Sequence, residues 1–388
     1  MTFSELGLRP ELLKAVAAAN YAAPTPVQAA VIPPILRAED VQACAQTGSG
    51  KTAAFALPML QRLVSRATAT DRRVSGLVLV PTRELATQVG EAFRTLGRYL
   101  PQPIKVLTVF GGVSINPQMM ALRGGADIVV ATPGRLLDLA DRNAVRLGDV
   151  NTLVLDEADR LLDEGFADEL SRVLALLPER RQNLLFSATF PPAVRSLADL
   201  LLRDPVRIDV ATTAAAGPPP DIQQRSIVVD PERRTQLLRY LIRHHGWERT
   251  LVFVATKYAT EHIARKLQRL GFDARALHGD LSQGARTQAL ADFKAGRVQV
   301  LIATDVAARG IDVVALSAVV NFDLPRSTAD YVHRIGRTGR AGTSGVAISF
   351  VTAAMEAHFR LIEKRNRFRL EREKVRGFEP RKSTSAPA

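Results

Sequence analysis

Short runs rich in Val, Leu and Ile alternate with helix-like stretches along almost the whole chain of 388 residues. The runs lie at 41–45, 76–80, 105–110, 127–131, 152–156 and 183–188, and then at 225–229, 250–255, 274–278, 298–303, 318–322 and 346–351. Continuous apolar runs separated by helices are typical of strands in a parallel sheet that helices cover on both faces. The pattern therefore predicts an α/β fold.

The alternation is interrupted at residues 211–220, ATTAAAGPPP, whose small and Pro-rich sequence is typical of a linker. At roughly 150 residues per domain, the length also favours two domains. We predict a first α/β domain over 1–210, a flexible linker over 211–220 and a second α/β domain over 221–365. Residues 366–388 would form a basic C-terminal tail, which we expect to be disordered. The second half repeats the architecture of the first without copying its sequence.

The net charge of +13 favours a polyanionic partner, most commonly a nucleic acid. Part of this charge is local, because residues 364–388 contain nine Lys or Arg and three Glu. This end is either a solvated tail or an extension that binds phosphates in a salt-sensitive way.

Other features of the sequence argue against disulfides, cysteine-based zinc sites, membrane spans and signal peptides. The single cysteine, Cys44, excludes an internal disulfide and a multi-cysteine zinc site, and we interpret it as a small buried side chain. No apolar run approaches the roughly 18 residues of a membrane span. The start, MTFSELGLRP, lacks the basic and apolar regions of a signal peptide. We expect a cytoplasmic protein without a membrane partner.

Residues 45–52 form a Gly-rich segment between a predicted strand and a predicted helix. They are Ala45, Gln46, Thr47, Gly48, Ser49, Gly50, Lys51 and Thr52. Such a turn directs backbone N–H groups at phosphates, Lys51 can reach the β- and γ-phosphates, and the Thr52 hydroxyl can bind Mg²⁺. Ala45 stands where the general phosphate-loop pattern has Gly. The alternative is a turn that contains GKT by chance.

Four acids follow the apolar run at 152–156, in LVLDEADRLLD. In a phosphate-loop domain a second strand ends in an acid that holds Mg²⁺ through water, and Asp156 is placed for this. Glu157 could then deprotonate an attacking water. A divalent ion would also offset the repulsion between the acids. The alternative is a helix N-terminus with acids facing the dipole, which could apply in part to Asp159 and Asp163.

Together, AQTGSGKT and DEAD resemble the first ATPase motifs of the DEAD-box RNA helicases. Further segments resemble the family's other motifs in the family's order: PTRELA at 81–86, GG at 111–112, TPGR at 132–135, SAT at 187–189, LVFVAT at 251–256, TDVAARGID at 304–312 and YVHRIGRTGR at 331–340. NYAAPTPVQ at 20–28 resembles the Q motif, with Asn20 where the family usually has Gly. The resemblance covers about residues 1–365, and GFEP at 377–380 weakly resembles the bacterial RhlE-type group.

The resemblance implies two tandem RecA-like domains, with ATP and Mg²⁺ as cofactors. It assigns adenine recognition to Gln28, with Phe3 and Tyr21 shaping the pocket, and ribose contact to Asp305. Ser187 and Thr189, with Asp159 and His333, would couple the nucleotide to domain closure. Ser187 and Thr189 could instead be a polar strand end.

Arg337 and Arg340 are three residues apart, so both can lie on one side of a helical turn or loop. By resemblance they are arginine fingers on the γ-phosphate. A generic basic patch is the alternative.

RNA would lie across both domains on groups that contact its backbone. By resemblance these are Thr82, Arg83, Gly112, Thr132 and Arg135 in the first domain, and Thr256, Arg286, Thr304 and Gly310 in the second. Arg and hydroxyl groups bind phosphates without reading bases, so binding would not depend on sequence. The chain has few aromatic residues that could stack on bases, which agrees with binding through the RNA backbone.

We therefore predict an RNA-dependent ATPase, which we expect to be a monomer. ATP and single-stranded RNA would close two domains and locally melt short duplexes or remodel RNA–protein complexes. Two alternatives stay open: an ATP-gated RNA clamp that scaffolds an assembly, and a DNA-directed motor of the wider helicase superfamily.

Overall fold

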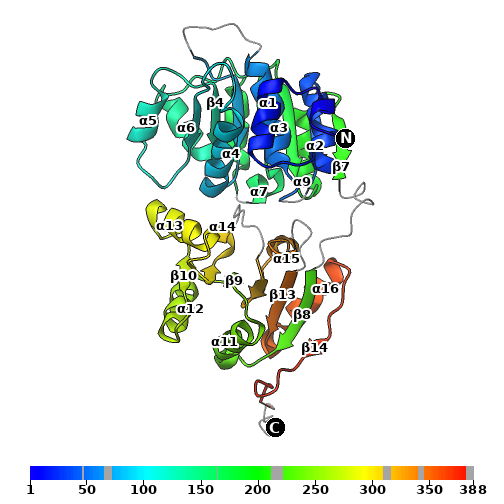
Figure 1. The fold of residues 1–388 in the computed structure, drawn as a ribbon, viewed down its shortest axis with the longest axis vertical. Coiled ribbons are helices and arrows are strands. Elements are labelled where there is room, and N and C mark those ends of the chain that lie inside the picture. The colour runs from blue at the N-terminus through cyan, green and yellow to red at the C-terminus, as the bar shows by residue number, and fades with distance from the viewer. Residues whose placement is uncertain are drawn as a thin grey trace. The chain divides into compact units, whose positions relative to one another are not determined.

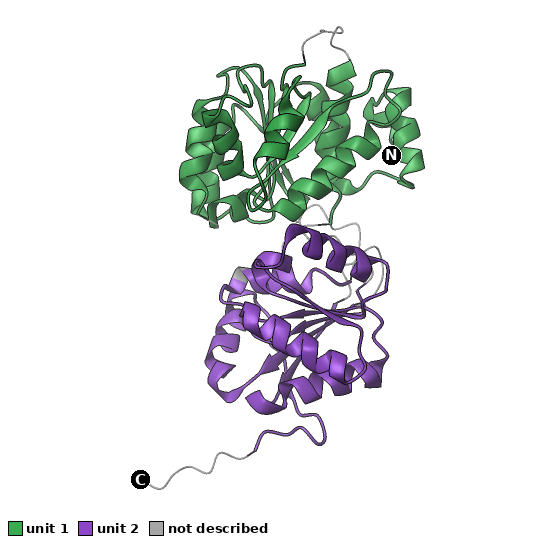
Figure 2. Cartoon of the chain, turned by 90° about the vertical axis from the view of Figure 1, so that its left-hand side faces the viewer, with its two compact units in different colours: residues 1–217 green, residues 218–388 purple. Residues whose placement is uncertain are grey.

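The computed structural model describes residues 1–45, 48–64, 72–163, 165–210, 222–308, 316–339 and 345–381. The chain divides into two compact units, residues 1–217 and residues 218–388 (Figure 2). Each unit contains one parallel sheet with helices packed against it (Figure 1). The predicted α/β fold is therefore confirmed in both units. The predicted linker, 211–220, lies outside the described residues.

The first unit contains a seven-stranded sheet in the order β3-β4-β2-β5-β6-β1-β7. Its strands are β1 (Val41–Cys44), β2 (Gly76–Leu79), β3 (Val106–Val109), β4 (Ile128–Ala131), β5 (Thr152–Leu155), β6 (Gln182–Ser187) and β7 (Val206–Asp209). All paired strands run parallel. Their carboxyl ends therefore meet at one edge of the sheet.

Side chains on the two faces of this sheet belong to two separate cores. Val78 and Val80 pack with α1 (Pro10–Ala18), α2 (Pro26–Leu36), α3 (Lys51–Val64) and α4 (Arg83–Leu96). Leu77 and Leu79 pack with α5 (Asn116–Leu122), α6 (Pro133–Asp141), α7 (Ala158–Asp163), α8 (Ala167–Ala175) and α9 (Pro192–Leu201). Because successive side chains point to opposite faces, a strand buried on both faces is apolar throughout.

The second unit contains a seven-stranded sheet in the order β10-β11-β9-β12-β13-β8-β14. Its strands are β8 (Ile222–Val228), β9 (Thr250–Phe253), β10 (Ala274–Leu277), β11 (Val300–Ala303), β12 (Ala318–Asn321), β13 (Gly345–Val351) and β14 (Arg372–Glu373). The helices are α11 (Arg234–His245), α12 (Lys257–Arg269), α13 (Gln283–Lys294), α14 (Asp305–Ala308), α15 (Thr328–Ile335) and α16 (Glu356–Arg365). When β8 is matched to β1 and the later strands in turn, the two strand orders are the same. This confirms the predicted repeat of architecture.

Two edge strands were not predicted from the sequence. β7 alternates half-buried and exposed residues, and β14 consists of two charged residues. Neither has the continuous apolar character on which the prediction depended, because an edge strand is less completely covered than a central one.

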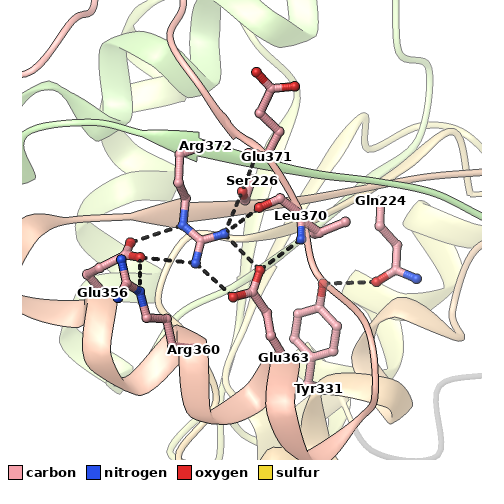
Figure 3. A network of polar contacts seen from close by, with 9 residues as sticks. All are labelled: Gln224, Ser226, Tyr331, Glu356, Arg360, Glu363, Leu370, Glu371 and Arg372. Atoms are coloured by element: carbon pink, nitrogen blue, oxygen red, sulfur yellow. Dashed lines mark hydrogen bonds and ion pairs between the residues drawn. The ribbon is translucent and has the colours of Figure 1, made fainter.

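The C-terminal segment corrects our expectation of a disordered tail over 366–388. Residues 366–381 are ordered against the second unit, where β14 pairs in parallel with Ser226 and Ile227 of β8. Arg372 lies between two glutamates of α16 (Figure 3). Residues 382–388 lie outside the described part of the chain.

A turn after α1 explains the departure from the Q-motif pattern at Asn20. The φ angle of Asn20 is +58°, in the left-handed region. Glycine adopts this region freely and asparagine is one of the residues that tolerate it best. The chain therefore keeps the turn that a glycine would make.

Among the helices that the structure describes, none is both long and apolar enough to cross a bilayer.

Candidate functional site

The polar motifs of the first unit meet at the carboxyl edge of its sheet. The Gly-rich segment follows β1, Asp156 follows β5, and Ser187 is the last residue of β6. These three strands are neighbours in the sheet, in the order β5-β6-β1. Ligands of open parallel sheets bind at this edge. The fold therefore brings together groups that are more than 100 residues apart in the sequence.

Lys51 begins α3 and its side chain is buried beneath the Gly-rich segment. Its Nζ donates a hydrogen bond of 2.9 Å to the Ala45 carbonyl and lies 3.9 Å from Asp156 Oδ1. Gly48 and Gly50 have φ angles of +85° and +92°, which a residue with a Cβ adopts only with strain. This lysine is thus held between the backbone of the loop and the acid that follows β5.

Three of the four acids after β5, namely Asp156, Glu157 and Asp159, are buried. Burial raises the pKa of Asp156 to about 6, and the charges of Glu157 and Asp159 add to the effect, while Lys51 opposes it. Glu157 adopts a φ of +53°, a strained value for a residue with a side chain. Its buried Oε2 accepts no hydrogen bond within the described structure, although Arg160 Nε lies 3.5 Å away.

Asp159 connects the acids to the end of β6. Its Oδ2 accepts hydrogen bonds from the Thr189 backbone N–H at 3.1 Å and from Thr189 Oγ1 at 2.7 Å. Its own N–H donates to Ser187 Oγ at 3.2 Å, and Ser187 Oγ donates to the Thr189 carbonyl at 2.7 Å. Three of the four residues that we predicted to couple the nucleotide to closure therefore form one hydrogen-bonded unit, and the fourth, His333, lies in the second unit.

Gln28 bridges the N-terminal part of the unit and the Gly-rich segment. Its Oε1 accepts a hydrogen bond from the Thr25 N–H at 2.9 Å, which completes a capping box at the start of α2. Its Nε2 donates to the Gly50 carbonyl at 3.1 Å. Oε1 can accept one more hydrogen bond and Nε2 can donate one more, which leaves room for the predicted pairing with adenine. The pairing itself stays a prediction. Sequence reasoning missed the contact with Gly50, because no local pattern marks a hydrogen bond over 22 residues.

Phe3 and Tyr21 lie side by side near the same end of the unit. Their rings stack with centroids 6.4 Å apart, Phe3 is buried, and Tyr21 is 39% exposed. An exposed ring with a buried ring behind it is a suitable wall for a flat base. Their role in the adenine pocket remains a prediction.

The predicted RNA contacts of the first unit gather at the ends of β2, β3 and β4. A Cβ placed on Gly112 would lie 2.2 Å from Arg83 Nη1, so the guanidinium lies directly against the glycine backbone. Arg135 Nη2 donates to the Val113 carbonyl at 2.9 Å. Thr82 and Thr132 occupy the N-cap positions of α4 and α6. Two arginines and two helix N-termini in one place suit a phosphate backbone.

In the second unit the acid after β11 is already paired with an arginine. Arg334 Nε and Nη2 donate to the two carboxylate oxygens of Asp305 at 2.5 and 2.6 Å. Arg334 Nη1 also donates to Asn321 Oδ1 at 3.0 Å and to the Asp323 carbonyl at 2.6 Å. The Asp305 carboxylate is therefore oriented and charge-paired, and its contact with a ribose stays a prediction. Sequence reasoning missed Arg334, although its place three residues after the buried Tyr331 puts it on the inner face of α15.

The other predicted residues of the second unit are placed as follows. Thr256 is the N-cap of α12, Thr304 directly precedes α14, and Arg286 is buried on α13. His333 lies on α15, and Arg337 lies in the turn that follows it. The predicted residues Gln46, Thr47, Gly310 and Arg340 lie outside the described part of the chain, so the proximity of Arg337 and Arg340 stays a prediction.

The donor set of the first unit fits a magnesium ion held largely by water. Among the described residues, no group of three His, Cys, Asp or Glu side chains is placed to hold a metal. Mg²⁺ instead keeps several waters and needs only one or two protein oxygens besides the substrate phosphates. The buried Asp156, with its raised pKa, and the buried Glu157 Oε2, which accepts no hydrogen bond within the described structure, are groups that a cation would stabilise. Binding of Mg²⁺ by the Thr52 hydroxyl and by Asp156 through water stays a prediction.

Comparison with protein families gives two matches that together span most of the chain. The model for the DEAD/DEAH box helicase matches residues 25–197, and the model for the helicase conserved C-terminal domain matches residues 233–342. The first match contains the Gly-rich segment and the acids, and the second contains Arg334 and Arg337.

Individual relatives are similar over nearly the whole chain. The ATP-dependent RNA helicase DeaD of Mycobacterium tuberculosis is 46% identical over 94% of this chain, and the DEAD-box ATP-dependent RNA helicase CshA of Bacillus cereus is 41% identical over 96%. The chain covers 63% and 69% of these two proteins, so it spans only part of their length.

Among solved structures, Saccharomyces cerevisiae Dbp5 bound to RNA and ADP BeF3 has a TM-score of 0.83. It is 35% identical, and the match covers 96% of this chain and 95% of that one. The two sheets are thus those of a tandem RecA-like fold, as predicted.

Proposed function

The chain belongs to the DEAD/DEAH box helicase family, and on this premise we propose that it is an RNA-dependent ATPase. It would bind ATP and single-stranded RNA, and locally unwind short duplexes or remodel RNA–protein complexes. The observation that supports this most directly is the hydrogen-bonded unit of Asp159, Ser187 and Thr189, because it joins the acids at the nucleotide site to the end of β6. The proposal places the protein in the cytoplasm, where both ligands are present.

Nucleotide binding follows from the geometry of the first unit. The backbone of the Gly-rich segment and Lys51 would hold the phosphates, and Gln28 would pair with the adenine edge, as glutamine does bidentately elsewhere. Because Gln28 also donates to Gly50, base recognition and the shape of the phosphate loop depend on one side chain. We therefore propose selectivity for ATP over GTP.

In this proposal Glu157 activates the attacking water, and two arginines of the second unit stabilise the transition state. The unsatisfied, buried carboxylate oxygen of Glu157 can accept a proton from a water that attacks the γ-phosphate. Mg²⁺, when bound, would neutralise charge on the phosphates. Arg337 and Arg340 would stabilise the transition state as arginine fingers, an effect worth about 10³–10⁵ in rate.

RNA binding would use backbone contacts in both units. Arg83, Gly112 and Arg135 offer guanidinium groups and close backbone approach in the first unit, and Thr256 and Arg286 would contribute in the second. Such contacts carry no base information, so binding would be independent of sequence. If both ligands touch both units, each favours the closed form that the other needs, and the ATPase depends on RNA.

The test is ATP hydrolysis with and without a single-stranded oligoribonucleotide, together with displacement of a strand from a short RNA duplex. The proposal predicts strong stimulation by RNA, little stimulation by the same DNA sequence, and ATP-dependent displacement. Stimulation without displacement would favour an ATP-gated RNA clamp. Equal stimulation by DNA would favour a DNA-directed motor, and an unstimulated rate would contradict the proposal.

A further inference from the structure

The C-terminal segment packs against the helix that precedes Arg337. Residues 366–373, which we call the C-terminal brace, lie beyond residue 342, where the match to the family model ends. We propose that this brace is a positioning element for α15, and that it sets the ATPase rate by fixing where Arg337 lies. This inference rests on the proposed role of Arg337 in hydrolysis.

The first contact of the brace is an aromatic stack on α15. The ring of Phe368 stacks on Tyr331 with centroids 5.3 Å apart and an interplanar angle of 26°. Phe359 of α16 meets the same ring edge-on at 6.0 Å. Tyr331 is fully buried between them, and its hydroxyl donates to Gln224 Oε1 of β8 at 3.2 Å. Tyr331 is thus held on several sides, one of which is the brace.

The second contact ties the brace to the beginning of α15. Asn366 Nδ2 donates to the Thr328 carbonyl at 3.0 Å and to the Ile362 carbonyl at 2.9 Å. Thr328 is the first residue of α15, and Ile362 belongs to α16. One amide therefore fixes the end of α16 against the start of α15.

Arg372 anchors the other end of the brace, as Figure 3 shows. Its Nε donates to Glu356 at 3.0 Å, its Nη1 and Nη2 donate to Glu363 at 2.8 and 2.9 Å, and Nη1 also lies 3.3 Å from Ser226 Oγ. The Leu370 N–H donates to Glu363 at 2.9 Å. Hydrogen bonds from Arg372 lower the pKa of Glu356 and Glu363, so both stay ionised. Since Asn366 and Arg372 fix both ends, Phe368 is held against Tyr331.

The far end of α15 leads directly to Arg337. One turn after Tyr331, Arg334 is fixed by Asp305, Asn321 and the Asp323 carbonyl. The Arg337 N–H donates to the Arg334 carbonyl at 3.2 Å, so its backbone continues from the last turn of the helix. A shift of α15 at Tyr331 would therefore move Arg337. Misplacing a catalytic group by about 1 Å can lower the rate of the chemical step about 100-fold.

The test compares Phe368→Ala and Arg372→Ala in the full chain, with Phe368→Tyr as the conservative variant. We expect kcat of the RNA-stimulated ATPase to fall about tenfold, with changes below about twofold in KM for ATP and in half-saturating RNA. Phe368→Tyr should retain the wild-type rate because it keeps the ring. The matched control is Arg297→Ala, which likewise removes a paired arginine of the second unit, from its 2.7 Å ion pair with Asp292, outside both the brace and α15.

A double-mutant cycle separates positioning from stability. In an Arg337→Ala background, Phe368→Ala should cause no further loss of rate, measured in single turnovers with excess enzyme so that slow hydrolysis is quantified. An unchanged kcat in a destabilised Phe368→Ala variant would overturn the proposal, as would a further loss in the Arg337→Ala background. A wild-type rate in Arg337→Ala alone would instead refute the proposed role of Arg337.

Discussion

Gln28 holds the phosphate loop through a hydrogen bond of 3.1 Å from its Nε2 to the Gly50 carbonyl. The same side chain closes the capping box of α2 through Thr25. Gly50 itself leaves no space for a larger residue, because a Cβ there would lie 2.5 Å from Gln28 Nε2. The adenine end and the phosphate end of the proposed nucleotide site are therefore one structure, and a change at Gln28 should affect both.

Replacing Gln28 by Ala should raise KM for ATP about tenfold, because one loop hydrogen bond and the adenine pairing are lost together. Preference for ATP over GTP should fall in the same variant, as measured by competition kinetics. Gln61→Ala is the matched control, since Gln61 also bridges backbone groups, those of Gly7 and Arg9, but lies near the opposite end of α3 from the loop. Unaltered KM and nucleotide preference in Gln28→Ala would contradict the assignment.

Replacing Gly112 by Ala should weaken RNA binding about tenfold and reduce its salt dependence, because the new Cβ would displace the guanidinium of Arg83. Fluorescence anisotropy at several salt concentrations measures both quantities. Gly124→Ala is an unusually close control. Its φ of +75° matches the +76° of Gly112, but apart from its own chain neighbours no atom of the described residues lies within 4 Å of its Cβ position. Equal losses in the two variants would show that backbone strain, and not Arg83, is responsible.

Glu157→Gln should lower kcat by about 10²–10⁴-fold while ATP and RNA still bind, because the amide keeps the shape of the side chain but cannot accept the proton. Rapid-quench kinetics and RNA anisotropy with ATP measure the two properties. Glu179→Gln, at an exposed position of the same unit, should behave as wild type. Normal turnover in Glu157→Gln would show that another group activates the water.

The raised pKa of Asp156, about 6 against an ordinary 3.8, makes a prediction about stability and pH. A carboxyl with a raised folded-state pKa favours the folded state at low pH, and this advantage is lost as pH rises through about 6. Without nucleotide or Mg²⁺, the free energy of unfolding relative to Asp156→Asn should therefore fall by about 1 kcal/mol from pH 5 to pH 7.5. Urea unfolding at both pH values measures the difference, and a constant difference would contradict the burial of a charged Asp156.

How far the sequence predicts this molecule depends on how local each feature is. β2 and β5 are almost entirely apolar because both of their faces are covered, so both strands were predictable. The Gly-rich segment and the acids were predictable because they lie next to strand ends. β7 and β14 lie at the edges of their sheets and are less buried, so the same pattern does not mark them.

Contacts between distant segments were not predictable from local patterns. Nothing around Gln28 indicates Gly50 as its partner, and nothing around Arg372 indicates Glu356 and Glu363. The basic C-terminal sequence resembles a solvated tail when each residue is read alone. It is ordered because Arg372 binds two carboxylates that lie about two helical turns apart on α16, and because Phe368 stacks on Tyr331.

The central claim is that ATP and RNA together bring the two units into one hydrolytic site, and resonance energy transfer between the units tests it most directly. Donor and acceptor dyes would be attached at Leu200→Cys and Arg269→Cys, both exposed, in a chain that also carries Cys44→Ser and Glu157→Gln. The account predicts a large change in transfer efficiency only when ATP and a single-stranded oligoribonucleotide are both present. The same efficiency with both ligands as with neither, or the full change with one ligand alone, would contradict it.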